Sequence, residues 1–233
     1  MAPLWIQGTV LGLVQGVSEF LPVSSSGHLI LVPFLTGWEH LGKAFDVALH
    51  LGTLVAIVAY FQDEVQGMGR VLGGSADARH RQLLQWLVAA TVPAGIVGLI
   101  LDSYLDRTFG GPRSVALFLA TFGLLLGWAD RVGRKNREMD QLRPRDVAVV
   151  GCAQILALVP GVSRCGITLT AGLLCGLTRS EAARFSFLMA LPVTLGAFVL
   201  KSGQLFGGGL SPEMRWACFL GMIVAAGSGW LCI

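Results

Sequence analysis

Charged residues are scarce in this sequence. Asp, Glu, Lys and Arg make up only 13% of the 233 residues, whereas hydrophobic residues make up 54% and the mean hydropathy is +0.68. In soluble domains about 25% of residues are charged. The composition therefore excludes an ordinary soluble enzyme and indicates an integral membrane protein.

CxxC pairs, basic segments interleaved with aromatics and a basic N-terminal segment are also missing. The five cysteines form no CxxC pair and have no histidine at metal-ligand spacing, so we interpret them as small hydrophobes. The net charge is only +3 and the basic residues are not interleaved with aromatics, which argues against a nucleic acid partner. No basic segment precedes the first apolar run, so we expect that run to be retained.

Long apolar runs, in contrast, are abundant. A helix that crosses the hydrocarbon core of a bilayer needs about 20 mainly apolar residues. Five segments are continuous enough to be such spans, and they cover residues 45–62, 83–101, 114–129, 185–200 and 216–233.

Two further apolar regions, 4–35 and 147–177, are interrupted near their middles by proline, glycine and serine. Irregular backbone at membrane depth is tolerated only where protein or a water-filled cavity covers it. We therefore interpret each region as a re-entrant helix hairpin, which enters the membrane and turns back. The predicted fold is an all-α polytopic membrane protein with a single domain at 1–233.

The two predicted hairpins resemble each other. Each contains a proline followed by a similar turn, "VSSSG" at 23–27 and "VSRCG" at 162–166, and each precedes a span led by Phe45 or Phe185. Chance similarity between Gly- and Ser-rich apolar segments is the alternative to duplication. Duplication predicts a first unit at 1–62, two connecting spans at 83–129, a second unit at 147–200 and a last span at 216–233.

Basic residues concentrate in two loops, 63–82 and 130–146. Two predicted spans separate these loops, so they share one side of the membrane, and the positive-inside rule makes that side cytoplasmic. The two hairpins then enter from opposite faces, which makes the repeats inverted. The first hairpin is expected to open to the outer face.

Three polar residues lie at predicted membrane depth. Gln15 and Glu19 are four residues apart and share one helix face. A carboxylate in the membrane is costly, which indicates a function for Glu19, although it could also only pair with Arg164. Arg164 stays charged in apolar surroundings and needs an anion, and its planar group suits phosphate.

Serine and glycine mark the predicted start of the second helix in each hairpin. Hydroxyls and backbone N–H groups at a helix start attract phosphate, although a serine cluster alone is more often an ordinary N-cap. Because Glu19, His28 and Arg164 are expected to lie near these serines, we favour a binding site over an ordinary cap. The ligand would be a phosphorylated headgroup that arrives from the lipid phase. The predicted phosphate-binding residues are Ser24, Ser25, Ser26, Gly27, Ser163, Arg164 and Gly166.

Other polar residues have less specific interpretations. His50 is interpreted as a packed, hydrogen-bonded histidine, and His40 as a solvated loop residue. Asp46 could cap its helix or hold a metal. Thr168 and Thr170 could bond back to their own helix or line a site.

With these motifs, the chain resembles the undecaprenyl-pyrophosphate phosphatase family, also known as the bacitracin-resistance family. "QGVSEFLPVSSSGHLIL" at 15–31 is similar to its first motif, Glu/Gln-x-x-x-Glu followed by a Ser-rich Gly-His turn. "PGVSRCG" at 160–166 is similar to its second, Pro-Gly-x-Ser-Arg-Ser-Gly. The segments "FDVALHLGTLVA" and "RFSFLMALPVTLGA" extend the resemblance over nearly the whole chain.

The resemblance implies hydrolysis of undecaprenyl diphosphate to undecaprenyl phosphate and inorganic phosphate. This reaction recycles the lipid carrier of cell-wall synthesis in the bacterial inner membrane and gives resistance to bacitracin. By position, the resemblance implies Ser25 as the nucleophile, His28 as the motif histidine and Arg164 with Ser163 as the phosphate-binding pair. Glu19 would complete the catalytic set, and Ser25 and His28 would exchange a proton.

The resemblance also implies a divalent cation, Mg²⁺ or Ca²⁺, on the face of Gln15 and Glu19. Gln15 takes the uncharged option of its motif, and Cys165 stands where the family usually has serine. The family pattern continues through one more membrane helix beyond the position of Ile233. Lipid or a second subunit, as in a homodimer, would take the place of that helix.

Three alternatives stay open. Type-2 phosphatidic-acid phosphatases have similar short pieces, but they need a histidine after their Ser-Arg, and "SRCGITLT" has none. Inverted repeats also occur in transporters, so the chain could move the lipid headgroup across the membrane with or without hydrolysis. Within the hydrolase reading, Ser25 could bind phosphate while water attacks directly.

Overall fold

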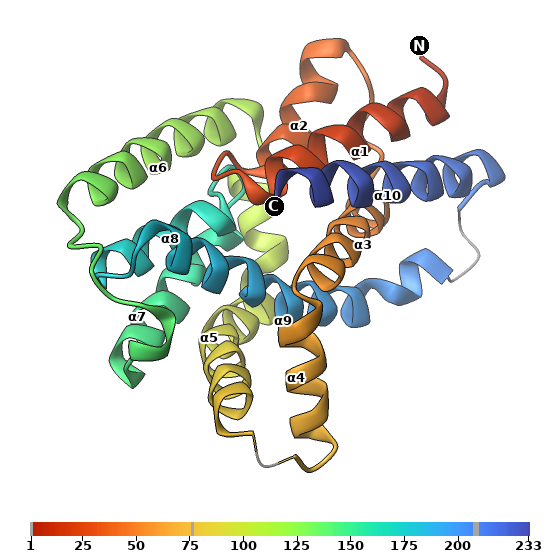
Figure 1. Ribbon diagram of the computed structural model, residues 1–233. Helices are drawn as coiled ribbons and strands as arrows, with labels where there is room; N and C mark the ends of the chain where they lie inside the picture. Colours follow the sequence, from red (N-terminus) through yellow and green to blue (C-terminus); the bar gives the residue numbers. More distant parts are fainter. Residues whose placement is uncertain (1, 76, 207–209) are drawn as a thin grey trace.

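The computed structural model describes residues 2–75, 77–206 and 210–233, and in these residues the regular structure is helical (Figure 1). Two short 3-10 helices accompany ten α-helices, and a single isolated bridge joins Arg137 to Leu177. The all-α prediction is confirmed. The helices are α1 (Leu4–Phe20), α2 (Ser25–Thr36), α3 (Lys43–Tyr60), α4 (Gln62–Leu72), α5 (Ala78–Phe109), α6 (Pro112–Val132), α7 (Pro144–Ile155), α8 (Arg164–Leu174), α9 (Arg179–Phe206) and α10 (Pro212–Cys232).

Five of these helices, α3, α5, α6, α9 and α10, are long and apolar enough to cross a membrane. They coincide with the five spans that the sequence predicts to within a few residues at most ends, so the chain is a multi-pass membrane protein. The largest difference is in α5, which is 32 residues long and extends beyond 83–101 at both ends. Asp77 caps its start by accepting hydrogen bonds from the N–H groups of Arg79 and His80.

The two interrupted regions form helix–turn–helix segments, as predicted. In the first, α1 ends at Phe20 and α2 begins at Ser25. In the second, a 3-10 turn at Leu156–Leu158 follows α7, and Gly161, with a φ of +95°, leads into α8. That left-handed backbone favours glycine.

Small residues let α1 and α10 lie side by side (Figure 1). A Cβ added to Gly12 would lie only 2.4 Å from the carbonyl oxygen of Gly221, and one added to Gly8 would lie 2.5 Å from that of Ala217. Such close backbone contact is typical of membrane helices, whose association depends on packing rather than on the hydrophobic effect.

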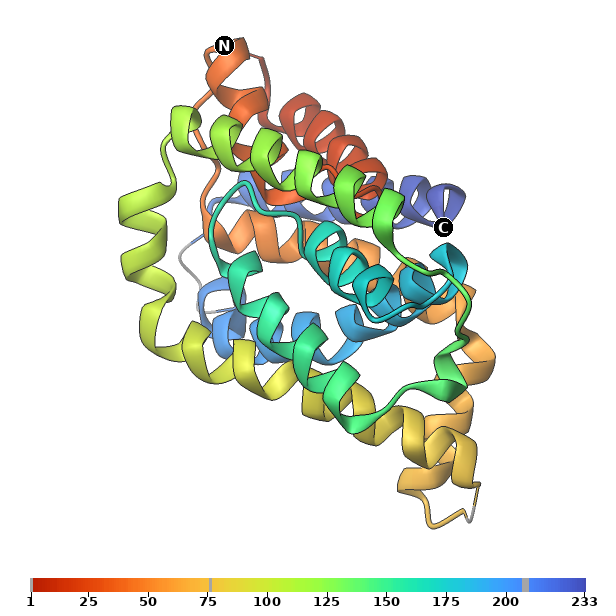
Figure 2. The same cartoon turned by 90° about the vertical axis from the view of Figure 1, so that its left-hand side faces the viewer.

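The helix α6 lies over the two helix–turn–helix segments and contacts both α2 and α8 (Figure 2). Its Val115 is fully buried between the two turns, where it contacts Gly27 and Gly161. The opposite face of α6 is apolar and exposed, with Leu124 77% exposed. In a membrane protein, such a surface is covered by lipid.

Ion pairs gather where α9 begins. Arg179 donates two hydrogen bonds to Asp130, at 2.6 and 2.7 Å, and Arg184 pairs with Glu64 of α4. Burial raises the pKa of Glu64, but its contacts with Arg184 outweigh this effect and hold the pKa below its usual range. The start of α9 thus lies beside both basic loops, as expected if these loops share one side of the membrane.

Candidate functional site

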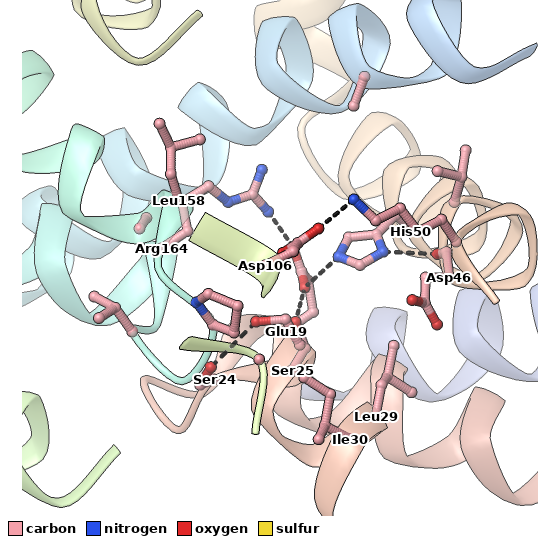
Figure 3. Close-up of a pocket in the computed structure, with 18 of the residues that line it drawn as sticks. Glu19, Ser24, Ser25, Leu29, Ile30, Asp46, His50, Asp106, Leu158 and Arg164 are labelled. Carbon is pink, nitrogen blue, oxygen red and sulfur yellow. Dashed lines mark hydrogen bonds and ion pairs between the residues drawn. The ribbon is translucent and has the colours of Figure 1, made fainter. Parts of the chain in front are cut away.

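A cavity of about 740 Å³ lies between the two helix–turn–helix segments and the helices α3, α5 and α9 (Figure 3). Glu19, Ser25 and Arg164 line it together with Ser24, Ser26 and Ser163. Leucine, isoleucine, valine and phenylalanine side chains from α2, α3, α9 and the second turn form its apolar walls. The cavity therefore combines a polar cluster with surfaces that suit a lipid chain.

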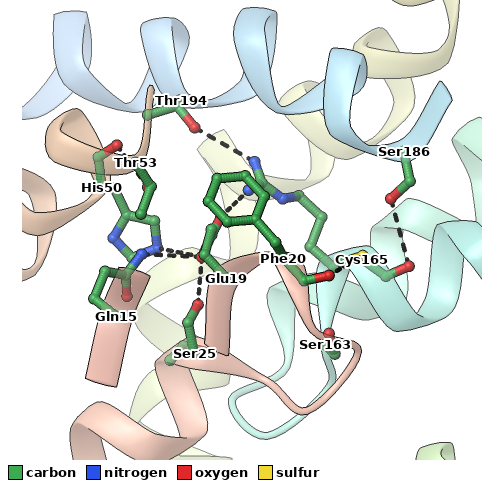
Figure 4. Close-up of polar contacts among 12 residues, drawn as sticks. Gln15, Glu19, Phe20, Ser25, His50, Thr53, Ser163, Cys165, Ser186 and Thr194 are labelled. Atoms are coloured by element: carbon green, nitrogen blue, oxygen red, sulfur yellow. Dashed lines mark hydrogen bonds and ion pairs between the residues drawn. The ribbon is translucent and has the colours of Figure 1, made fainter. Parts of the chain in front are cut away.

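Glu19 is the centre of the polar cluster (Figure 4). One carboxylate oxygen, Oε1, pairs with the guanidinium of Arg164. The other, Oε2, accepts a hydrogen bond from Ser25 Oγ at 2.5 Å and one from Gln15 Nε2 at 3.0 Å. The Nε2 atom of His50 lies 3.6 Å from Oε2. Residues from α1, α2, α3 and α8 thus meet around one buried carboxylate.

Arg164 is held in a fixed orientation at the first position of α8. Its Nη2 donates to Glu19, and its Nη1 lies 3.4 Å from Thr194 Oγ1 of α9. The Arg164 side chain is 19% exposed, whereas that of Glu19 is 6% exposed. The guanidinium is thus available to the cavity while Glu19 lies behind it.

The two turns use matching serine caps. Ser24 Oγ accepts from the N–H of Gly27 at 3.2 Å, and Ser163 Oγ accepts from the N–H of Gly166 at 3.0 Å. The two glycine N–H groups that the sequence assigns to phosphate are therefore already bonded within the caps. Ser24, Ser26 and Ser163 line the cavity, so their hydroxyls are the better candidates for phosphate contact.

His28 does not lie where the sequence predicts it. Its Nδ1 lies 2.9 Å from the carbonyl oxygen of Ser24, and the described residues show no hydrogen bond between His28 and Ser25. His28 is also not among the described residues that line the cavity. The structure does not support proton exchange between these two residues, and it indicates that His28 stabilises the turn through Ser24, whose φ is +62°.

His50 was interpreted from the sequence as a packed histidine, and the structure corrects this in part. Its Nδ1 lies 2.7 Å from the Asp46 carbonyl oxygen, as expected of a hydrogen-bonded ring, but the ring also lines the cavity and faces Glu19. A sequence signal for this position exists. Lys43, Asp46 and His50 recur at helical spacing, which predicts one polar face on an otherwise apolar span.

The remaining predicted residues have local roles. Thr168 and Thr170 donate to the carbonyl groups of Arg164 and Gly166, so both bond back within α8. Cys165 is buried, and its Sγ lies 3.6 Å from the carbonyl oxygen of Phe20. The cysteine thus links the two helix–turn–helix segments. His40 is partly exposed, but it lines the cavity and its Nε2 lies 3.5 Å from Asp46 Oδ2.

Gln15 and Glu19 do not form a ready cation site. Both oxygens of Glu19 already accept from other side chains, and Gln15 turns its amide N–H toward them. The described residues contain no group of three or more His, Cys, Asp or Glu side chains placed to hold a metal. The side-chain oxygen of Gln15 is buried without a hydrogen-bond partner in this part of the chain, so a cation would require the pair to rearrange.

These features define a multi-pass helical membrane protein in which two helix–turn–helix segments meet at a buried ionic cluster beside an open cavity. The chain matches the family described as bacitracin resistance protein BacA over residues 8–233, and it belongs to this family. The match covers both motifs and all five candidate spans.

Relatives named as undecaprenyl-diphosphatases match the chain over almost its whole length. It is 47% identical over 230 residues to the undecaprenyl-diphosphatase of Moorella thermoacetica, covering 98% of this chain and 86% of the relative. It is 47% identical over 235 residues to undecaprenyl-diphosphatase 2 of Stutzerimonas stutzeri, covering 98% and 87%. It is 45% identical over 233 residues to the undecaprenyl-diphosphatase of Trichlorobacter lovleyi, covering 98% and 86%.

Proposed function

We propose that this protein is an undecaprenyl-diphosphatase of the bacterial inner membrane, which returns the lipid carrier of peptidoglycan synthesis to its monophosphate form and confers bacitracin resistance. The observation that supports this proposal most strongly is the short hydrogen bond from Ser25 to Glu19. It lies beside Arg164, at a cavity with apolar walls. A nucleophile, a base and a phosphate-binding cation are the groups that phosphate hydrolysis needs.

Phosphate binding is the first step that the cluster performs. The terminal phosphate takes the guanidinium of Arg164 from Glu19, because a phosphate offers two or more charged oxygens to the planar fork. The Ser24, Ser26 and Ser163 hydroxyls add neutral hydrogen bonds. Glu19 then loses its counter-charge and becomes a stronger base next to Ser25.

The phosphate that Arg164 binds is then attacked by Ser25. Ser25 Oγ attacks the terminal phosphorus while its proton passes to Glu19 Oε2, which it already faces at 2.5 Å. The bond from this phosphorus to the bridging oxygen breaks, and undecaprenyl phosphate leaves. Water then hydrolyses the phosphoserine and releases inorganic phosphate. His50, on the other side of Glu19, offers a route for the proton to the cavity.

Apolar cavity walls receive the prenyl chain. Leu29, Ile30 and Phe34 of α2 lie on one side, and Leu158 and Val193 lie on another. Burial of isoprene units against these side chains provides affinity that does not depend on the headgroup, at about 25 cal/mol per Å² of apolar surface.

Internal duplication explains why three pairs of residues, each 139 positions apart in the sequence, have the same structural roles. Each unit caps its second short helix with serine, packs a glycine of its first helix against another helix backbone, and buries a glutamine oxygen that has no partner in the described chain. The pairs are Ser24 with Ser163, Gly12 with Gly151, and Gln15 with Gln154. These parallels support repeat units at 1–62 and 147–200, joined by 83–129 and followed by 216–233.

We place both helix–turn–helix segments in the membrane as re-entrant hairpins. Their second helices, α2 and α8, are apolar but have only 12 and 11 residues, too short to cross a bilayer. The exposed apolar face of α6 would be covered by lipid in a monomer and partly by a second copy in a homodimer.

The cavity is expected to open to the outer, periplasmic face. With the basic loops 63–82 and 130–146 in the cytoplasm, the chain before α3 lies outside. In a background without native cysteines, Ser26→Cys should react with a membrane-impermeant thiol reagent on spheroplasts, and Thr178→Cys should not. Permeabilised spheroplasts give the total reactivity of each variant. The reverse pattern of labelling would overturn this orientation.

A divalent cation requirement is tested by restoring the carboxylate at position 15. In Gln15→Glu, two carboxylates face each other at the position of a 3.0 Å contact, and a cation relieves their repulsion. We expect activity to be retained and the Mg²⁺ concentration for half-maximal activity to fall severalfold. Gln154→Glu, at the equivalent position away from Glu19, is the control, and an unchanged Mg²⁺ titration would remove Gln15 from any cation site.

An assay in reconstituted vesicles distinguishes hydrolysis from lipid transport. Labelled undecaprenyl diphosphate is supplied, and released phosphate and movement between leaflets are measured on the same sample. The proposed function predicts stoichiometric phosphate release. Movement of intact diphosphate without phosphate release would instead identify a flippase.

A further inference from the structure

Outside the Glu19 cluster, a second set of charged residues lines the same cavity. Lys43 Nζ, at the first position of α3, lies 3.2 Å from Asp102 Oδ2 and also pairs with Asp106. The two aspartates are four residues apart and thus share one face near the end of α5. All three side chains line the cavity, and Figure 3 shows Asp106 at the cavity with Glu19 and His50.

This ion-pair set bridges two helices that otherwise make little contact. In the described part of the chain, α3 packs mainly on α10 and α9, and α5 packs mainly on α7 and α9. The contact between α3 and α5 is therefore not needed to hold either helix in place. A polar bridge across a cavity is well placed to respond to what enters the cavity.

The distribution of cations around the cavity suggests a role for the ion pairs of Lys43 with Asp102 and Asp106. Among the described residues, Lys43 and Arg164 are the two lysine or arginine side chains that line the cavity. A diphosphate carries charge on two phosphoryl groups, whereas Arg164 can hold only one of them in its fork. Lys43, which already lines the cavity, is the second cation and is available to the other phosphoryl group.

We propose that Lys43 is a second phosphate-binding residue, which pairs with Asp102 and Asp106 and transfers to the diphosphate headgroup when substrate binds. This inference rests on the proposed function and extends it to selectivity. Arg164 binds the phosphoryl group that is removed, and Lys43 binds the one that stays on the lipid. Two cations at two phosphoryl groups favour the diphosphate substrate over the monophosphate product and inorganic phosphate.

Exposure explains why Lys43 can change partners. The side chains of Lys43, Asp102 and Asp106 are 44%, 42% and 34% exposed. Ion pairs this exposed contribute little because water screens them, and the aspartates regain water when Lys43 leaves. A lysine ammonium is a mobile point charge on a flexible stem, which suits an exchange of partners better than a fixed fork.

Variants at the bridge should change substrate affinity in opposite directions. We expect Lys43→Met to raise KM for undecaprenyl diphosphate about tenfold and to change kcat less. A tenfold change corresponds to the loss of one charge-assisted hydrogen bond. Asp106→Asn weakens the competing partner of Lys43 and should lower KM. The double variant should behave like Lys43→Met, because Asp106 acts only through Lys43.

Binding of inorganic pyrophosphate and inorganic phosphate, measured by calorimetry, tests the inference without turnover. Lys43→Met should weaken binding of pyrophosphate about tenfold and leave that of phosphate nearly unchanged. Arg107→Met, which removes an equal charge next to Asp106 outside the cavity lining, should leave both affinities at the wild-type value.

A merely structural bridge gives a different pattern. Lys43→Met and Asp106→Asn would then lower thermal stability together and shift neither ligand selectively, and this result would overturn the inference. If the wild type releases no phosphate from undecaprenyl diphosphate, the proposed function fails instead. In that case, the pyrophosphate measurement still decides whether Lys43 recognises a diphosphate group.

Discussion

Replacement of Arg164 by lysine should lower kcat for phosphate release by at least about a hundredfold, although the charge is kept. The guanidinium spans two partners, Glu19 through Nη2 and Thr194 through Nη1, and it must present two parallel N–H groups to the phosphate. A lysine ammonium cannot hold Thr194 and present a planar fork at the same time. It also leaves the charge of Glu19 less well compensated.

The control for this variant is Arg184→Lys. Arg184 also pairs with a carboxylate, Glu64, but it lies outside the cavity lining. Both variants are purified and compared for thermal stability and for initial rates of phosphate release. Near-wild-type turnover by Arg164→Lys would show that the fork is not needed and would contradict the assigned role.

Ser25→Ala should nearly abolish turnover, by at least about a thousandfold, while the protein stays folded. Within the part of the chain that the structure describes, the hydroxyl that donates to Glu19 is the only one placed to attack phosphorus and pass its proton to this carboxylate in the same step. Ser24→Ala should be milder, because it removes a helix cap that contributes about 1 kcal/mol of stability and one neutral phosphate contact, but leaves the nucleophile in place. Ser26→Ala, next to Ser25 at the start of α2, is the matched comparison, because it removes a neutral phosphate contact at the cavity but not the nucleophile.

Covalent catalysis and direct water attack are distinguished by whether the transferred phosphate becomes bound to the protein. Rapid acid quench with labelled diphosphate should trap phosphate on Ser25 of the wild type and none on Ser25→Ala. An active Ser25→Ala protein would show that water attacks directly and that Ser25 only binds phosphate.

Local sequence patterns predicted the spans and the helix breaks well. Hydrophobic runs of about 20 residues have few alternatives in a membrane. The breaks were predictable because Pro22 and Gly161 stand in turns immediately before serine caps. The sequence offered the contact between Glu19 and Arg164, which are far apart in the chain, only as the alternative to a function for Glu19, since each is costly to bury without the other.

The two histidines show where local spacing misleads. His28 is three residues from Ser25, but helical side chains point toward the N-terminus, so its ring reaches the Ser24 carbonyl four residues back. His50 is distant in sequence and enters the cluster only because α3 packs beside α1. The helical spacing of Lys43, Asp46 and His50 predicts a polar face on this span, but it does not predict that this face packs against Glu19.

The charged bridge was missed for the same reason. Lys43 precedes a span, and Asp102 and Asp106 follow the predicted end of another, so each reads as an ordinary loop charge. The structure extends α5 to Phe109 and brings these charges to the cavity. Polar residues at helical spacing near the ends of spans are the signal that would have found them.

The most direct test of the central claim is phosphate release from undecaprenyl diphosphate by the purified protein, compared with Ser25→Ala and Arg164→Lys in the same detergent. We expect the wild type to release one inorganic phosphate and one undecaprenyl phosphate per substrate, and either variant to release almost none. Absence of phosphate release by the folded wild type, or equal release by all three proteins, would contradict the assignment of hydrolysis to the cluster of Glu19, Ser25 and Arg164.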